Sequence, residues 1–177
     1  MEIKTKEAII SETKNSNQRA VEWFDAIPPN QFFIREGEIW SASDNVDHLI
    51  KAIKPIALAL KMPRLGLQAM FGKAEHPSRT YAEICKIYVA EIAKGAQASG
   101  RFLPDQESPA EPEIQKKSLL IQLSRAGDSL LSALEKWQDV ELDQYQLPHP
   151  ILGKLTIREM LFFSIYHTLR HARIEGD

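Results

Sequence analysis

Apolar residues recur at every third or fourth position along much of the chain, which is the spacing of one face of an α-helix. The clearest run steps by three and four over Leu120, Leu123, Gly127, Leu130, Leu134 and Trp137. Such stripes predict helices over roughly residues 4–27, 41–60, 80–100, 113–137 and 156–174, with Ser41 or Ser43 as the N-cap of the second. We therefore expect an all-α fold, a bundle of four main helices plus one with short helices in the connections.

Prolines mark where these helices end or are interrupted. The PPN motif at residues 28–30 ends the first helix. Pro55 lies inside the second and removes a backbone hydrogen bond at a cost of about 3 kcal/mol, so we predict a kink or break between Lys51 and Pro55. The segments RFLPDQESPAEP and DQYQLPHPILGKL are interpreted as loops, and no segment has the pattern of a β-hairpin. Thr156 and Glu159 have the spacing of a capping box at the start of the last helix.

Composition and charge narrow the class of protein. The 177 residues, 44% hydrophobic and 26% charged, predict a single globular domain over residues 1–177.

The N-terminus lacks the apolar core of a secretory signal, and no apolar run approaches the ~18 residues that span a bilayer. One cysteine, Cys85, excludes an internal disulfide and fits a reducing compartment. With a net charge of −2 and no basic block, we expect a cytoplasmic protein with no nucleic-acid partner and no membrane partner.

Two histidines on the last helix are candidate metal ligands. His167 and His171 continue the core stripe that begins at Ile157 and Met160, so both rings are predicted to point inward, one helical turn apart. Buried imidazoles need polar partners. A shared metal ion would satisfy them, and so would backbone carbonyls or a tyrosine; the spacing alone leaves these alternatives open.

A metal site needs a third ligand, and the chain has three further histidines. His76 and His149 stand beside prolines and are interpreted as solvated loop residues. His48 lies on the second helix, at the flank of its apolar stripe, where a surface position is the simpler interpretation.

Two segments together resemble the DinB-like (YfiT-like) superfamily. The first is EIWSASDNVDHLI, with a Trp-Ser pair, an acidic residue and then His48 followed by Leu49. The second is HPILGKLTIREMLFFSIYHTLRHARI, with His-Pro, Leu-Gly, a threonine that opens the last helix and a His-x3-His pair. The resemblance implies a four-helix bundle that binds one divalent metal through three histidines. Carried over by motif, these ligands are His48, His167 and His171.

The same resemblance implies candidate chemistries. Some members are thiol S-transferases that join a low-molecular-weight thiol to a small-molecule electrophile; a metal-dependent hydrolase and a non-catalytic, stress-linked metal-binding protein are the alternatives. Imidazole ligands suit several divalent ions, of which we expect Zn²⁺ or Ni²⁺. The resemblance also implies a homodimer.

Other residues near the motifs have alternative roles. Asp44 is one turn before His48 and either orients that ring or stabilises the helix N-terminus. Trp40 is a candidate pocket residue or a core anchor. Cys85 is interpreted as an inert helical residue, so a thiol nucleophile would come from outside the chain. No general base is evident from the sequence.

Overall fold

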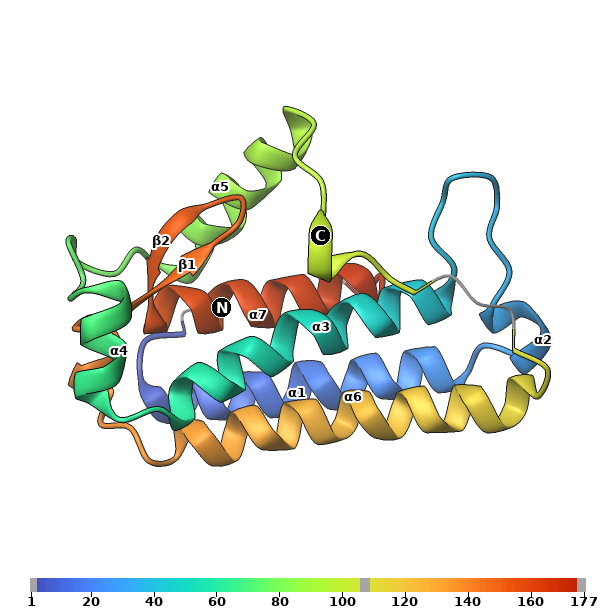
Figure 1. Ribbon diagram of the computed structural model, residues 1–177, viewed down its shortest axis with the longest axis horizontal. Coiled ribbons are helices and arrows are strands. Elements are labelled where there is room, and N and C mark those ends of the chain that lie inside the picture. The colour runs from blue at the N-terminus through green and yellow to red at the C-terminus, as the bar shows by residue number, and fades with distance from the viewer. Residues whose placement is uncertain (1–2, 106–108, 175–177) are drawn as a thin grey trace.

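The computed structural model describes residues 3–105 and 109–174. Within these ranges, four long helices lie side by side (Figure 1): α1 (Lys6–Asp25), α3 (Ala42–Lys61), α6 (Pro112–Leu134) and α7 (Ile157–His171). The connections contain α2 (Pro29–Phe32), α4 (Arg64–Phe71), α5 (Tyr81–Ala93) and two short 3-10 helices, η1 (Gly100–Phe102) and η2 (Asp139–Asp143). The predicted all-α bundle, with short helices in its connections, is confirmed.

Side-chain caps fix the N-termini of the two helices that carry the histidines. Ser41 is the N-cap of α3: its hydroxyl accepts the Asp44 N–H, and the Asp44 carboxylate accepts the Ser41 N–H. Thr156 and Glu159 form the predicted capping box at the start of α7. These reciprocal bonds satisfy amides that have no partner within a helix, and so fix where each helix begins.

Helix α7 is enclosed by other elements over its first half. Every residue from Ile157 to Ile165 is buried, because α1, α3 and α5 pack around it. The surrounding helices place polar as well as apolar side chains of α7 in the interior. His167 and His171 lie in the second half of this enclosed helix.

Helices α1 and α6 pack closely through a small residue. Gly127 on α6 lies against Asn17 on α1, and a Cβ added at Gly127 would come within 2.2 Å of Asn17 Nδ2. Around this contact the predicted stripe of α6 is buried, including Leu123 and Leu130 at 0% exposure.

Helix α3 is not broken at its proline. It runs unbroken from Ala42 to Lys61 with Pro55 inside it, so of the predicted kink or break between Lys51 and Pro55 the break is wrong, and the kink stays a prediction. Ile53 and Ile56, on either side of the proline, are 2% and 7% exposed. Burial of such side chains is worth about 1.5–3 kcal/mol each, which outweighs one lost backbone bond.

A β-hairpin was also missed. Residues interpreted as a loop form β1 (Gln146–His149) and β2 (Gly153–Thr156), which pair antiparallel with His149 opposite Gly153. The strands are short and Pro148 stands inside the first, which obscures the alternating pattern. Gly153 adopts a left-handed conformation, φ 73°, where the hairpin closes. The hairpin and α5 lie on the same side of the bundle, over α7 (Figure 1).

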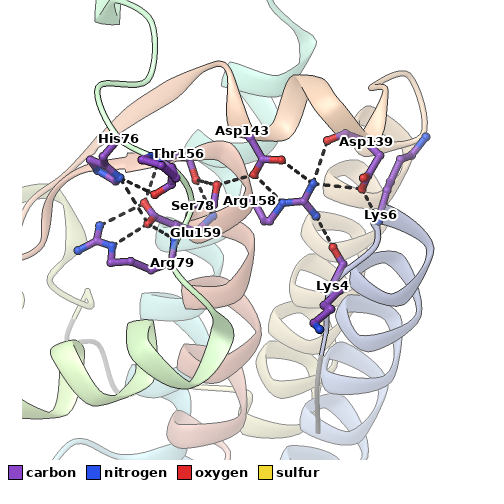
Figure 2. A network of polar contacts seen from close by, with 11 residues as sticks. Lys4, Lys6, His76, Ser78, Arg79, Asp139, Asp143, Thr156, Arg158 and Glu159 are labelled. Atoms are coloured by element: carbon purple, nitrogen blue, oxygen red, sulfur yellow. Dashed lines mark hydrogen bonds and ion pairs between the residues drawn. The ribbon is translucent and has the colours of Figure 1, made fainter.

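A polar network joins segments that are distant in sequence at the start of α7 (Figure 2). The Arg158 guanidinium donates to the Asp143 carboxylate at 2.7 and 3.0 Å, to the Lys4 carbonyl at 2.7 Å and to Asp139. The N-terminal segment and η2 are thereby attached to α7.

The same network includes the loop before α5. The Glu159 carboxylate, 0% exposed, accepts the Arg79 backbone N–H at 2.8 Å and its side-chain Nε at 2.7 Å. Ser78 hydrogen bonds to both Asp143 and Thr156. Among the described residues, no helix combines the length and apolarity needed to cross a membrane.

Candidate metal centre

The structure brings His48, His167 and His171 together where α3 and α7 pack. One nitrogen from each ring can be chosen so that all three atoms lie within 4.8 Å of one another. His48 and His167 are 6% and 4% exposed, and their Nε2 atoms are 3.0 Å apart. His48, interpreted from its position alone as a surface residue, is therefore an interior one.

Two of the rings are oriented by hydrogen bonds at their other nitrogen. His48 Nδ1 lies 2.7 Å from the Phe102 carbonyl, and His171 Nδ1 lies 2.6 Å from Asn45 Oδ1. A carbonyl oxygen accepts only, so the Nδ1 of His48 carries the proton and its Nε2 presents a lone pair. With the Asn45 oxygen as acceptor, His171 has the same tautomer, and its Nε2 lone pair is left for the cluster.

Burial keeps the three rings neutral at neutral pH. It lowers the pKa of His48 and, with the neighbouring His171 and His48, lowers that of His167 well below its ordinary value. Burial and the nearby His48 lower the pKa of His171 to about 3. Neutral imidazoles are the form that binds metal.

The donor set fits a divalent cation. The convergent nitrogens include two lone pairs fixed by hydrogen bonds at Nδ1, which is how metal-binding histidines are ordinarily held. Three imidazoles are also the protein ligands of open, catalytic zinc sites.

Aromatic side chains enclose the cluster. The Trp40 ring stacks on His171, with centroids 6.1 Å apart and planes at 25°, and the Phe163 ring stacks on His167 at 4.8 Å and 26°. Trp40 lines the adjacent cavity as well, so the pocket interpretation of this residue is the one that the structure supports.

The cluster opens onto a cavity of about 700 Å³. Its walls come from α3, α4, α5, α7, η1 and the β-hairpin, and most of the side chains are apolar, among them Ile56, Leu58, Met62, Met70, Phe71, Ile92 and Met160. A space of this size and lining suits a small organic molecule.

Asp44 does not orient His48. Its carboxylate accepts hydrogen bonds from Ser41 and from Arg35 Nε, whereas the His48 ring contacts the Phe102 carbonyl. Burial raises the pKa of Asp44, but the bonds from Arg35 and Ser41 outweigh burial and hold it below its ordinary value. Asp44 is thus a capping residue.

Two further residues flank the site differently. Cys85 on α5 is half-buried and does not line the cavity. Arg170 on α7, the residue before His171, does line it.

His149 is a cavity residue that the sequence interpretation missed. It is 8% exposed on β1, packs edge-on against Phe163 and is not a solvated loop residue. Its Nδ1 accepts the backbone N–H groups of Ile151 and Leu152 at 3.1 and 3.0 Å, so its proton is on Nε2. Burial lowers its pKa to about 4. The HPILG sequence, with proline and glycine around a turn, was the available signal.

His76 is half-buried in its loop, where its ring contacts the Pro77 carbonyl.

These features define a class: a helical bundle with three convergent histidines beside an apolar cavity. A sequence model of the DinB superfamily matches residues 12–174. The chain therefore belongs to the DinB superfamily. No curated protein matches the chain.

Among solved structures, the chain is similar to the colibactin self-resistance protein ClbS, crystallised in complex with double-stranded DNA. The TM-score is 0.53 at 15% identity, and the match covers 96% of this chain and 92% of ClbS. At this identity the likeness shows the fold alone.

The ClbS complex contradicts our expectation of no nucleic-acid partner, because a protein of this fold is crystallised with duplex DNA. That expectation rested on a net charge of −2. Net charge averages over the whole surface, whereas phosphate contacts depend on local charge.

Proposed function

We propose that the chain binds one divalent metal ion, Zn²⁺ or Ni²⁺, through Nε2 of His48, His167 and His171, and that it acts as a thiol S-transferase. The observation that carries the proposal is the convergence of three neutral, buried imidazoles at the wall of an apolar cavity. The transferase assignment comes from the family resemblance, and the cavity supports it by offering space for a small-molecule substrate.

The residues around the cluster have distinct parts in this proposal. A divalent ion held by three neutral ligands would keep its full charge and would lower the pKa of a thiol bound to it. The Phe102 carbonyl and Asn45 Oδ1 hold the protons of their histidines on Nδ1, away from the cluster. The mostly apolar walls of the cavity offer the electrophile a place to bind beside the thiolate sulphur.

The proposed transfer changes no oxidation state overall and needs no redox partner. The thiol gives its proton to solvent, and its sulphur forms a bond to an electrophilic carbon of the substrate. The electron pair of the bond that breaks leaves with the displaced group.

A hydrolase is the weaker alternative because it needs a base to activate water. Among the described residues that line the cavity, the carboxylate is Glu38, which is exposed to solvent. His149 is not available as a base, since its Nδ1 already accepts two amides. A non-catalytic metal-binding role is disfavoured by the large cavity beside the cluster.

Metal content by elemental analysis tests the site. We expect about one divalent ion per wild-type chain after incubation with zinc or nickel. His167→Ala and His48→Gln should both lose that ion. The Gln side chain fills more of the space of the imidazole than Ala does, so the second variant disturbs the packing less. His76→Ala is the matched control, because that histidine lies outside the cluster, and it should bind the metal like the wild type. Metal in equal amount in all four folded proteins would show that the histidines are not the ligands.

The reaction is tested separately with metal-loaded protein, a panel of low-molecular-weight thiols and the apolar electrophile monobromobimane. Mass spectrometry of the product distinguishes a thioether from a product of water attack. A thioether formed faster with the wild type than with His167→Ala supports the transferase. Water incorporation would favour the hydrolase, and no acceleration with any thiol would leave a metal-binding role only.

The homodimer and the cytoplasmic location stay predictions. Light scattering of the purified protein measures the first, and fractionation of the cells that produce it measures the second.

A further inference from the structure

We propose that a second pocket beside the histidines binds the carboxylate end of the thiol co-substrate, while the larger apolar cavity holds the electrophile. The pocket, of about 470 Å³, is lined by Ile39, Trp40, Asn45, Arg170, His171 and Arg173. This inference rests on the proposed function, because it assigns the two substrates of that reaction to two hollows on either side of the same residues.

The two hollows share part of their walls. Trp40, Arg170 and His171 line both of them. Trp40 and His171 are stacked on one another, which makes them one continuous aromatic wall at the junction. A molecule in the second pocket therefore lies against His171, which is itself a member of the histidine cluster.

His171 connects the second pocket to the cluster through its two nitrogens. Its Nδ1 contacts Asn45, which lines the second pocket, and its other nitrogen is left for the cluster with His48 and His167. A ligand anchored in this pocket can thus direct a short chain past the edge of the imidazole toward the metal ligands.

The charges of the second pocket select an anion. Among the described residues that line it, the charged ones are Arg170, in the last turn of α7, and Arg173, which follows the helix. The Asn45 oxygen accepts from His171, and its Nδ2 donates to the Ser41 carbonyl at 2.7 Å. The positive charges of Arg173, which is exposed, and of Arg170 are therefore what favours an anion in this pocket. Guanidinium groups bind carboxylates through paired, charge-assisted hydrogen bonds.

The larger cavity has a different character. It is lined mostly by aliphatic and aromatic side chains, and its charged lining residues, Glu38, Arg101 and Arg170, include an acid, which the described lining of the second pocket lacks. Its size and apolar walls suit an uncharged organic molecule. The contrast assigns the polar, anionic substrate to the second pocket and the apolar substrate to the cavity. A thiol with a carboxylate group a few bonds from its sulphur fits this arrangement, because the carboxylate can bind in the second pocket while the sulphur reaches the histidine cluster.

The test compares two thiols that differ at one end, where one has a charged carboxylate and the other a neutral amide. Mercaptopropionate and its neutral amide, mercaptopropionamide, are titrated calorimetrically into protein whose metal content has been measured on the same sample. We expect the wild type to bind the acid at least about tenfold more tightly, the effect of one charge-assisted hydrogen bond. Arg173→Gln should reduce this preference severalfold or more, as should Arg170→Gln. The control Arg125→Gln makes the same charge change on the exposed surface of α6 and should retain the preference.

Arg173 is the primary variant because it is exposed and its replacement does not threaten the core. A carboxylate that chelates the metal directly would give a preference that survives in Arg173→Gln and Arg170→Gln, and this result would overturn the inference. Equal affinities for acid and amide in metal-containing wild type would also overturn it. Failure of the proposed function is seen beforehand and separately, as absence of metal from the wild type before any thiol is added.

Discussion

At the scale of single residues, Asn45 is the side chain that tests the proposed metal site without removing one of its three histidines. Its Oδ1 accepts the His171 Nδ1 proton at 2.6 Å. Loss of such a supporting bond ordinarily costs 10- to 100-fold in metal affinity, because the ring turns more freely and becomes less basic. We expect Asn45→Ala to weaken Zn²⁺ binding by about tenfold or more, measured by competition with a chromogenic chelator.

Asp44→Asn is the matched control for this prediction. Asp44 is the adjacent residue, but it pairs with Arg35 and caps α3 without contacting a histidine in the described hydrogen bonds. This variant should unfold at lower urea concentration and keep its Zn²⁺ affinity. The reverse result, with affinity lost in Asp44→Asn and kept in Asn45→Ala, would show that Asp44 supports the site and that our assignment of this role to Asn45 is wrong.

The ligand residues could be proposed from the sequence, whereas their supports could not. His167 and His171 are one helical turn apart, a local spacing that the sequence displays, and the family resemblance added His48. The Phe102 carbonyl is 54 positions from His48, and Asn45 is 126 from His171. Contacts over such separations depend on how the helices pack, and no local pattern encodes them. His149 was misassigned for the same reason, since the helices that bury it are formed elsewhere in the chain.

At the scale of helix packing, the contact of α1 with α6 depends on Gly127. In an open helical position, Gly→Ala stabilises by up to about 1 kcal/mol. Here the new Cβ would lie 2.2 Å from Asn17 Nδ2, so the helices must separate or Asn17 must move. We expect Gly127→Ala to lower the free energy of unfolding by about 1–3 kcal/mol in urea denaturation.

The double variant identifies the cause of that loss. Asn17 is largely buried, and its Nδ2 has no hydrogen-bond partner among the described residues. In an Asn17→Ala background the obstruction is gone, so Gly127→Ala should become neutral or stabilising. Additive losses in the double variant would show that the two residues act independently and that this contact is not what limits the packing.

The β-hairpin is held by His149, which acts as a local turn residue. Its Nδ1 accepts two backbone amides of the turn, at Ile151 and Leu152. We expect His149→Ala to cost about 1–3 kcal/mol, because both amides lose their acceptor. His149→Asn should recover part of the loss, since the Asn oxygen can occupy a position near that of Nδ1.

Urea denaturation of the two variants measures this difference. Equal stability of His149→Ala and His149→Asn would mean that the ring contributes through its packing on Phe163 and not through the hydrogen bonds.

The helices were predictable because their signals are local, and the exceptions have physical causes. Periodic apolar residues and the capping pairs placed the long helices within a few residues of their observed ends. The hairpin was missed because each strand has four residues and one contains a proline. The break at Pro55 was predicted from a local cost that tertiary packing of its neighbours outweighs.

At the scale of the whole molecule, stability should fall as the pH falls, for two reasons. One is the polar network of Figure 2, and the other is the set of buried histidines. Burial raises the pKa of Glu159, but the hydrogen bonds from Arg79 outweigh burial and hold it below its ordinary value. The histidine pKa values are lowered by burial, to about 4 for His149 and about 3 for His171. In each case the unfolded chain takes up a proton at higher pH than the folded protein does.

We therefore expect the metal-free protein to lose stability in two stages on acidification. Below the ordinary histidine pKa of about 6.5, each buried neutral imidazole lowers the free energy of unfolding by up to about 1.4 kcal/mol per pH unit. The carboxylates add to this loss below about pH 4.5, because the unfolded chain then takes up a proton at Glu159 while the folded protein keeps the ion pair with Arg79 to lower pH. Urea denaturation of chelator-treated protein between pH 8 and pH 4 measures the dependence.

Two variants separate the contributions. Glu159→Gln should be less stable than the wild type by about 2–3 kcal/mol at pH 7, because Arg79 loses a buried charged partner but is itself partly solvated. That deficit should shrink as the pH falls below 4.5, since the wild type then loses the same charge. His149→Asn should flatten the curve between pH 6.5 and 4, because one buried imidazole no longer titrates. A wild-type curve that is flat from pH 7 to 4, or a Glu159→Gln deficit that is the same at all pH values, would show that these groups do not link protonation to folding.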